Sequence, residues 1–216
     1  MRIAVLGTGI VGQTIGKKLV ELGHEVAMGS RTATNEKAAQ WATETGGQTG
    51  TFDEVSIGVE VIFNCTNGEK SLEALSSISP GNLDGKVLID LANELEVVNS
   101  KPRSLASADN SLGAKIQNAF PNLRVVKTLN TVNTMVMVNP SLVPGYHNIF
   151  MNGDDDSAKT VVRELLESFG WPTEAVLDMG GIDNAVGPEM LMAFWLTVFL
   201  SGNGAPNANF NIAIVK

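Results

Sequence analysis

Apolar residues follow two alternating patterns along the 216-residue chain. Short runs rich in Val, Ile and Leu are typical of buried strands. The longer segments between them carry apolar residues at three- and four-residue spacing, as one face of a helix does. This alternation predicts an α/β fold with a mainly parallel, doubly wound sheet and helices on both of its faces. We expect strands at residues 3–6, 25–29, 48–51, 59–65, 86–90, 125–128, 148–152 and 176–178.

Helices are expected in most of the segments that connect these strands. The polar stretch 94–103, which contains Pro102, predicts instead a loop over the carboxyl edge of the sheet. The length favours one domain over residues 1–216, with an extension from about residue 153 to 216 that ends in a short helical cap. The predicted helices span residues 11–22, 35–45, 53–57, 69–77, 104–119, 157–169 and 187–200.

The most apolar segment is MLMAFWLTVFL at residues 190–200, in which Thr197 is the single polar residue. It falls well short of the ~20 residues that span a bilayer, so we expect no membrane anchor. A helix that is apolar on every side has to be covered on every side. Two arrangements satisfy this requirement: the helix lies in a homodimer interface, or it forms the centre of the core.

Composition narrows the class of protein. With 44% hydrophobic and 18% charged residues, the chain has the composition of a globular protein. Its net charge of −8 disfavours nucleic acid and anionic membranes as partners. The single cysteine, Cys65, excludes an internal disulfide and a multi-thiolate metal site. The first predicted strand begins directly after Met1 and leaves no room for a targeting segment, so we expect a cytoplasmic protein.

A glycine-rich turn, GTGIVG at residues 7–12, lies between the first predicted strand and the first predicted helix. Gly7 permits the tight turn, Gly9 leaves room for a pyrophosphate, and Gly12 lets the helix approach the strand. The helix N-terminus offers free N–H groups and a partial positive charge to the phosphates. This G-x-G-x-x-G spacing within a βαβ unit predicts a Rossmann fold that binds a dinucleotide.

The residues at the end of the second strand indicate which dinucleotide is bound. NAD-binding chains place an acid about 20 residues after the glycine turn, where it holds the ribose hydroxyls. This chain has Ser30, Arg31, Thr32 and Thr34 there instead. A guanidinium beside hydroxyl groups suits a 2′-phosphate, so NADP is the predicted cofactor. The alternative is that Arg31 is a solvated loop cation and the site does not discriminate.

Amides and hydroxyls follow the later strands at the same predicted edge. Such side chains can orient riboses and a carboxamide but offer little acid–base chemistry, so we predict no catalytic residue and no metal ligand. The histidines, the lysines and Cys65 have ordinary structural explanations in the sequence. A site without an acid favours hydride exchange between two redox cofactors, which mainly requires stacking and orientation. The predicted cofactor contacts here are Thr66, Asn67, Gly68, Asn93 and Asn130.

The chain resembles the coenzyme F420-dependent NADP oxidoreductases, which exchange hydride between NADP and an 8-hydroxy-5-deazaflavin. The resemblance covers nearly the whole chain. It rests on residues 1–31, which end in Gly-Ser-Arg, on VVKTLNTV at 125–132 and on NGDDDSAKTVVRELLESFGW at 152–171. More distant relatives include the cytosolic domains of ferric and cupric reductases, which pass electrons from NADPH to a flavin.

This resemblance implies roles for particular residues. Thr8, Gly9, Ile10 and Val11 would cradle the pyrophosphate, Ser30 and Arg31 would hold the 2′-phosphate, and Gly68 and Leu72 would lie near the adenosine or ribose half of NADP. The chain departs from the deazaflavin enzymes at residues 66–68, around residues 129–131 and at residues 185–189. The second substrate is therefore left open.

Three functions are compatible with these residues. The first is an NADP(H)-dependent oxidoreductase that transfers hydride between the nicotinamide and a stacked flavin-like or deazaflavin acceptor, as a flavin reductase does. The second is an NADPH-dependent reductase of a small carbonyl or imine, which needs a proton donor that the sequence does not reveal. The third is a non-catalytic sensor of the NADP(H) redox state.

Overall fold

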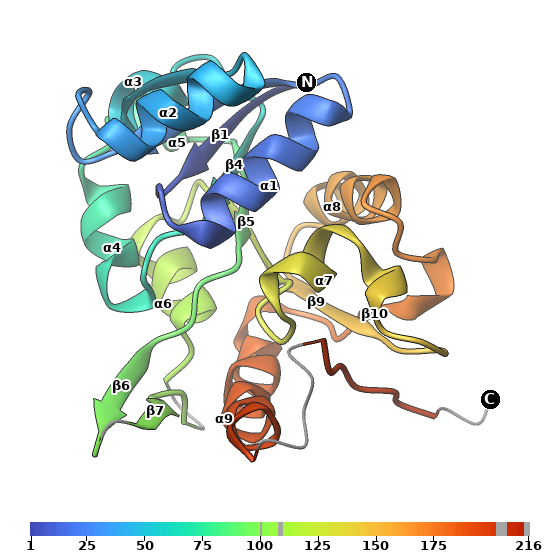
Figure 1. Ribbon diagram of the computed structural model, residues 1–216. Helices are drawn as coiled ribbons and strands as arrows, with labels where there is room; N and C mark the ends of the chain where they lie inside the picture. The colour runs from blue at the N-terminus through green and yellow to red at the C-terminus, as the bar shows by residue number, and fades with distance from the viewer. Residues whose placement is uncertain (100, 108–109, 202–206, 214–216) are drawn as a thin grey trace.

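A computed structural model describes residues 1–99, 101–107, 110–201 and 207–213. Its core is an eight-stranded sheet in the order β10-β9-β8-β5-β4-β1-β2-β3. The chain starts in the middle of the sheet, moves to one edge through β2 and β3, and then continues to the other side, so the sheet is doubly wound as predicted (Figure 1). The strands are β1 (Arg2–Leu6), β2 (Glu25–Ser30), β3 (Gln48–Thr51), β4 (Val61–Asn64), β5 (Val87–Asp90), β8 (Arg124–Thr128), β9 (Ile149–Gly153) and β10 (Val176–Asp178).

Pairing within the sheet is parallel except between β8 and β9. The carboxyl ends of β1, β2, β4, β5 and β8 therefore meet at one edge, and the residues that follow these strands face a common crevice. The one antiparallel pair aligns Thr128 with Met151 and reverses the direction of the last two strands. The C-terminal extension thus completes the same sheet.

Helices cover both faces of this sheet. One face carries α1 (Ile10–Glu21), α2 (Glu36–Thr45), α7 (Thr134–Val138) and α8 (Asp156–Ser168), of which α1 and α8 lie on the near side in Figure 1. The other face carries α3 (Phe52–Ser56), α4 (Gly68–Ser76), α5 (Pro80–Leu83) and α6 (Leu112–Ala119). Two apolar cores result, one on each face, because the strand side chains alternate between them. The short helices α5 and α7 were not predicted.

The prediction of a loop at residues 94–103 is wrong. This segment forms a hairpin of β6 (Leu95–Val98) and β7 (Lys101–Ser104), and Pro102 pairs with Val97 in it. Proline is tolerated there because the hairpin is two-stranded and each strand keeps a free edge. The predicted helix 104–119 begins only at Leu112, where Ser111 caps it by accepting from the backbone N–H of Ala114. Residue 100 of the predicted loop and residues 108–109 of the predicted helix lie outside the described residues.

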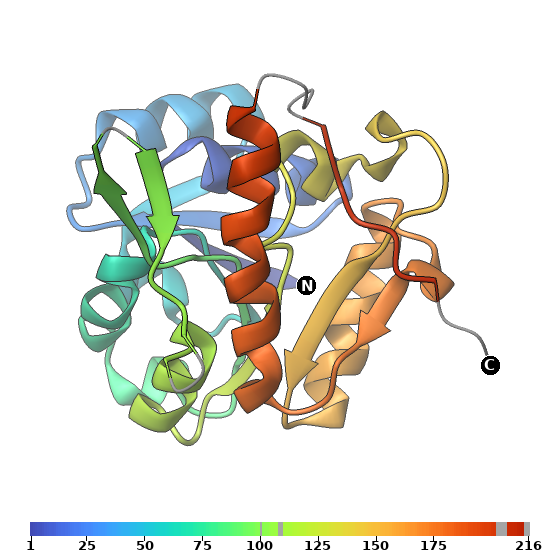
Figure 2. The same cartoon turned by 90° about the horizontal axis from the view of Figure 1, so that it is seen from below.

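The apolar helix α9 (Val186–Leu200) crosses the molecule between the β6–β7 hairpin and the C-terminal segment (Figure 2). Trp195 and Leu196 are buried, but Phe194 is 57% exposed and Met190 49%. The helix is therefore not the centre of the core, and that alternative is wrong. Within the described residues, no helix has the length and apolar character needed to cross a membrane.

Candidate dinucleotide-binding site

The glycine turn after β1 is held in place by close backbone contacts. Gly7 has a φ of +115°, and its N–H donates to the carbonyl of Gly29 at 3.0 Å. A Cβ on Gly7 would lie 2.6 Å from the carbonyl oxygen of Cys65, and one on Gly12 would lie 2.0 Å from that of Gly7. Gly9 is different, because a Cβ there would meet nothing within 4 Å. Two glycines thus fix the turn, and the third leaves an open approach to it.

The first turn of α1 is a suitable place for an anion. Its N-cap, Gly9, has no side chain to satisfy the N–H groups that every helix start leaves free. The loop carbonyl of Thr8 is held by the side-chain amide of Gln13 at 3.0 Å, which keeps the turn ordered. The free N–H groups and the positive end of the helix dipole can therefore bind a phosphate.

A first cleft of about 680 Å³ extends from this turn along the carboxyl end of β2. Its walls come from the glycine turn, the loop after β2 and helix α4, on the other side of β1. The cleft therefore joins two segments about forty residues apart in sequence. It is lined by Gly7, Thr8, Gly9, Ser30, Arg31, Thr32, Asn35, Phe52, Cys65, Thr66, Asn67, Lys70, Glu73, Ala74 and Ser77.

Ser30 orders the loop that carries the predicted phosphate-binding residues. Its hydroxyl donates to the carbonyl of Thr32 at 2.5 Å and accepts from the N–H of Thr32 at 3.3 Å. The side chains of Arg31 and Thr32 are exposed at the cleft. Asn35 is already engaged, because its side chain caps α2 by accepting from Ala38. Arg31 is therefore the loop residue best placed to reach a charged ligand group.

A second cleft of about 440 Å³ continues from the first and shares Gly9, Cys65, Thr66 and Asn67 with it. Together the two clefts form a trough on both sides of the glycine turn, as an extended dinucleotide requires. The residues that line the second cleft are all uncharged. Besides the four shared residues they are Ile10, Val11, Gly68, Leu91, Ala92, Asn93, Leu95, Asn130, Val132, Asn133, Thr134, Met137, Met192 and Trp195.

Several of the predicted amide and hydroxyl contacts also hold the site together. Asn93 donates to the carbonyl of Asn130 at 2.8 Å, and the side-chain amide of Asn130 donates to Asn93 at 3.1 Å. This reciprocal pair joins the loops after β5 and β8. The hydroxyl of Thr66 lies 2.7 Å from Asn64 Oδ1, and Asn67 caps α4 by accepting from Glu69. These side chains retain only part of their hydrogen-bonding capacity for a ligand.

Three buried charged residues lie behind the second cleft. Lys127 Nζ is 2.7 Å from Asp90 Oδ2 and 3.1 Å from Glu189 Oε1, and it also donates to the carbonyl of Ala92 in the cleft wall. Burial raises the pKa of Asp90, and the attraction of Lys127 opposes only part of that change. Burial alone would lower the pKa of Lys127, but the charges of Asp90 and Glu189 raise it. The ammonium group is therefore held in its charged form.

Glu189 connects this cluster to two helices. It belongs to α9, and its carboxylate accepts from the backbone N–H groups of Leu112 and Gly113 at 2.7 and 3.0 Å, at the start of α6. The same helix α9 supplies Met192 and Trp195 to the second cleft, where the Trp195 indole donates to the carbonyl of Ala208. The sequence signal for this arrangement is one acid in an otherwise apolar helix and one lysine inside a strand.

The remaining predicted contacts lie in different places. Gly68 is buried at the start of α4, where a Cβ would lie 2.2 Å from the carbonyl oxygen of Asn93. Gly12 packs against Gly7, and Leu72 packs at the edge of the core; neither residue lines a cleft. Cys65 lies where the clefts meet, and burial together with the charge of Asp90 raises the pKa of its thiol. Sequence reasoning missed the cleft residues Lys70, Glu73, Met192 and Trp195.

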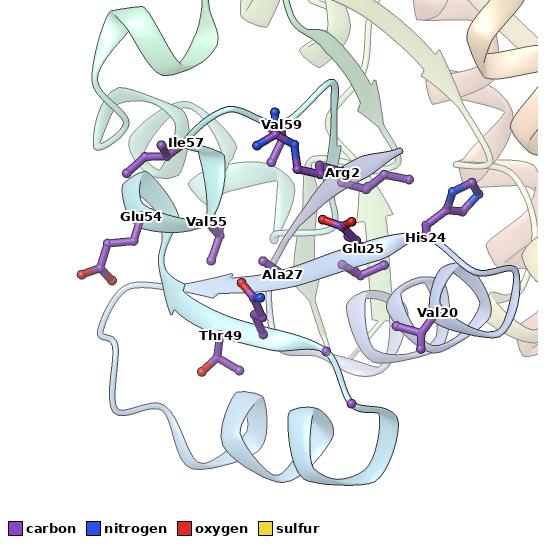
Figure 3. Close-up of a pocket in the computed structure, with 15 residues that line it drawn as sticks. Arg2, Val20, His24, Glu25, Ala27, Thr49, Glu54, Val55, Ile57 and Val59 are labelled. Atoms are coloured by element: carbon purple, nitrogen blue, oxygen red, sulfur yellow. The ribbon is translucent and has the colours of Figure 1, made fainter.

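A third hollow of about 510 Å³ lies at the opposite, amino end of the strands (Figure 3). Arg2, Glu25 and Glu54 bring charges of both signs to it, together with His24. It contains no part of the glycine turn, and parallel sheets of this type bind ligands at the carboxyl ends of the strands. Among the described residues there is no group of three His, Cys, Asp or Glu side chains that could hold a metal ion.

Comparison with known proteins identifies the family. A sequence model of coenzyme F420-dependent NADP oxidoreductases matches residues 2–94. The crystal structure of a provisionally named F420-dependent NADP reductase from Arthrobacter sp. FB24 is 40% identical, covers 99% of this chain and 100% of its own, and has a TM-score of 0.91. The chain belongs to the coenzyme F420-dependent NADP oxidoreductase family. The members of this family are named as NADP-dependent oxidoreductases, and these matches do not specify an acceptor.

More distant matches extend beyond this family. Metalloreductase STEAP3 of Rattus norvegicus is 27% identical over 185 residues, which are 85% of this chain and 35% of the rat protein. An uncharacterised oxidoreductase of Shewanella frigidimarina is 29% identical over 94 residues, 41% of this chain and 32% of that protein. The chain therefore spans about a third of the length of these curated relatives. An imine reductase from Bacillus cereus, 17% identical with a TM-score of 0.65, shares the fold alone.

The family match has a boundary that matters for the site. Residues 2–94 include every residue that lines the first cleft, among them the glycine turn, Arg31 and the residues of α4. The far wall of the second cleft lies beyond that match, in Leu95, Met137, Met192 and Trp195 among others. The part of the chain that matches the family model thus contains all of the first cleft but only part of the second.

Proposed function

We propose that this chain binds NADP(H) along the two clefts and transfers hydride between the nicotinamide and a flavin-like or deazaflavin acceptor. The pyrophosphate lies on residues 8–11 and the 2′-phosphate on Ser30, Arg31 and Thr32. The nicotinamide half enters the second cleft beside Thr66, Asn93 and Asn130. Supporting this placement, both clefts open onto the glycine turn, and a Cβ at Gly9 would point into free space.

The observation that carries the proposed reaction is the uncharged lining of the second cleft. Reduction of a carbonyl or imine needs a proton donor at the reacting atom. The described walls offer the hydroxyls of Thr66 and Thr134 and the thiol of Cys65, whose pKa is raised by burial, and these groups are weak acids. A flavin or deazaflavin ring spreads the accepted electron pair over its own π-system, so the protein mainly has to stack and orient two rings. The lining of the second cleft therefore favours a flavin or deazaflavin acceptor over a carbonyl or imine.

The far wall of the second cleft supports the same proposal. Met137, Met192 and Trp195 present two thioethers and an indole, side chains that make favourable contacts with flat aromatic rings. Trp195 is held in place by its hydrogen bond to Ala208 and by stacking on Phe199 at a centroid distance of 5.3 Å. An acceptor bound between this wall and the nicotinamide would be covered on both faces by apolar or aromatic groups.

The test is to mix the purified protein with NADPH and a panel of flavins and deazaflavins, and to follow the nicotinamide absorbance band. We expect oxidation of NADPH with at least one ring acceptor. Turnover with small carbonyls or imines only would favour the reductase alternative. Binding of NADPH without any turnover would favour the redox sensor. Either result would overturn the proposed reaction.

A matched pair of variants examines the acceptor wall. Met192→Ala removes a side chain from the second cleft, so we expect a higher KM for the acceptor and an unchanged Kd for NADPH. Met135→Ala is the control, because Met135 is 52% exposed and lines neither cleft. Equal effects of the two substitutions on the acceptor KM would count against this assignment of the wall.

The chain is also proposed to act as a homodimer. Met190 and Phe194 lie one turn apart on the same side of α9, and both are about half exposed, which is costly in water for apolar side chains. A second copy related by a two-fold axis would cover both helices at once. Light scattering at micromolar concentration should give a dimer for the parent chain and a monomer for Phe194→Glu. A monomeric parent chain would refute this part of the proposal.

A further inference from the structure

An acidic residue lines the first cleft, although the loop after β2 contains none. Glu73 comes from α4 and shares the cleft with Ser30, Arg31 and Thr32. In NAD-binding chains of this fold the selective acid follows the second strand, whereas Glu73 belongs to a helix that follows the fourth strand. The fold therefore brings a carboxylate to the region where NADP and NAD differ.

Glu73 is influenced by two cations from different parts of the chain. Lys70 Nζ lies 2.9 Å from Glu73 Oε2, and both side chains are about two-thirds exposed, at 67% and 66%. The hydrogen bond from Lys70, the charge of Lys70 and then the charge of Arg31 lower the pKa of Glu73. Lys70, in the first turn of α4, pairs directly with the Glu73 carboxylate, whereas Arg31, directly after β2, shares the cleft with it.

We propose that Glu73 competes with the 2′-phosphate of NADP for Lys70 and Arg31, and that these three residues together set the preference for NADP over NAD. This inference rests on the proposed binding of NADP along the first cleft. Two cations and one anion give the free cleft a net charge of +1. This charge attracts a phosphate, but less strongly than the two cations would without Glu73.

The proposal makes opposite predictions for the two charges on α4. A bound 2′-phosphate repels the Glu73 carboxylate and takes over Lys70 as a charge-assisted donor, so neutralising Glu73 should tighten NADPH binding. NADH has a ribose hydroxyl at that position, and a carboxylate can accept a hydrogen bond from it. Loss of the Glu73 charge should therefore not tighten NADH binding, and loss of Lys70 should weaken NADPH binding selectively.

The experiment compares the Kd values of NADPH and NADH, measured by calorimetry, for the parent chain, Glu73→Gln and Lys70→Met. Glu73→Gln should raise the affinity ratio of NADPH to NADH about fivefold and Lys70→Met should lower it about fivefold, the size expected for solvent-exposed charges. Both effects should shrink at high salt. Glu69→Gln is the matched control, because Glu69 makes the same charge change on the same helix but lines neither cleft.

Three results would overturn the inference. The first is a change in the affinity ratio of NADPH to NADH for Glu73→Gln that is no larger than that for Glu69→Gln. The second is a lower ratio for Glu73→Gln. The third is an unchanged ratio for Lys70→Met. An absence of hydride transfer would sink the proposed reaction but not this inference, because the binding ratio is independent of turnover. Adenosine 2′,5′-bisphosphate and ADP serve as a second pair of probes that lack the nicotinamide half. If neither they nor NADPH binds, the inference and the proposed function both fall.

Discussion

The ammonium group of Lys127 lies 2.7 Å from the carboxylate of Asp90, and neither side chain reaches solvent. Asp90 ends β5 and Lys127 belongs to β8, so the pair joins neighbouring strands directly behind the second cleft. Glu189 adds a third charge from α9 at 3.1 Å. The cluster ties the loop after β5 and the helix of the far wall to the sheet. It therefore supports two parts of the wall of the cleft in which hydride transfer is proposed.

Removal of the buried ammonium should be costly. Lys127→Met leaves two carboxylates buried without their cation, and we expect a loss of about 3–5 kcal/mol in the free energy of unfolding. Lys115→Met is the control, because Lys115 is partly exposed and pairs with a single carboxylate, that of Glu94, so we expect a smaller loss. Urea denaturation measures the free energy of unfolding of both variants and of the parent chain. A loss for Lys127→Met no larger than that of the control would contradict the structural role of the cluster.

Gly9 and Gly12 should respond differently to the same substitution. A Cβ at Gly12 would overlap the carbonyl oxygen of Gly7, so Gly12→Ala should lower the melting temperature strongly. Gly9→Ala meets no protein atom within 4 Å and should fold normally, but its methyl group would occupy the approach of the pyrophosphate. Calorimetric titration with NADP should then show about tenfold weaker binding, or about 1.4 kcal/mol. Unchanged NADP affinity in folded Gly9→Ala would argue against the pyrophosphate position.

Arg31 should distinguish the two pyridine nucleotides. Arg31→Ala removes the exposed cation at the end of β2, and we expect NADP binding to weaken by about 1–3 kcal/mol, as for a lost charge-assisted contact. NAD lacks the phosphate, so its affinity should hardly change. Parallel calorimetric titrations with NADP and NAD measure the two affinities. An equal loss of affinity for both nucleotides would show that Arg31 does not contact the 2′-phosphate.

Acid should remove part of the stability of α8. The hydroxyl of Ser157 and the N–H of Ala158 donate to Asp155 and lower its pKa below the ordinary 3.8. A carboxyl whose pKa is lower in the folded state stabilises the fold above its ordinary pKa, and that stabilisation is lost as pH falls through the folded value. Asp155→Asn keeps a capping side chain that does not titrate.

The urea midpoints of the parent chain and Asp155→Asn should therefore converge or cross between about pH 6 and about pH 2. Other acids titrate in both proteins, so the difference between the two curves isolates Asp155. A difference that stays constant over this range would mean that the carboxylate form of Asp155 contributes nothing to the cap.

The hairpin at residues 95–104 shows where sequence reasoning fails. Its strands are only four residues long, and β7 is polar and contains Pro102, so the segment lacks the apolar alternation that marks a half-buried strand. The pairing is set by its neighbours, since β7 packs beside α9 and Ser104 donates to the carbonyl of Glu189. Such contacts between residues 85 positions apart leave no local signal.

The amino-acid sequence by itself determined the features that depend on residues close together in the chain. These are the order of strands and helices, the glycine turn at residues 7–12 and the basic loop at Arg31, because turn geometry and periodicity are local properties. Tertiary structure alone decided which distant residues share a cleft. Strand order brought Glu73 to the cleft of Arg31, and packing of α9 brought Glu189 to Lys127 and Trp195 to the second cleft. The physical reason is that burial and charge pairing act between surfaces, and the sequence spacing of two residues does not reveal which surfaces will meet.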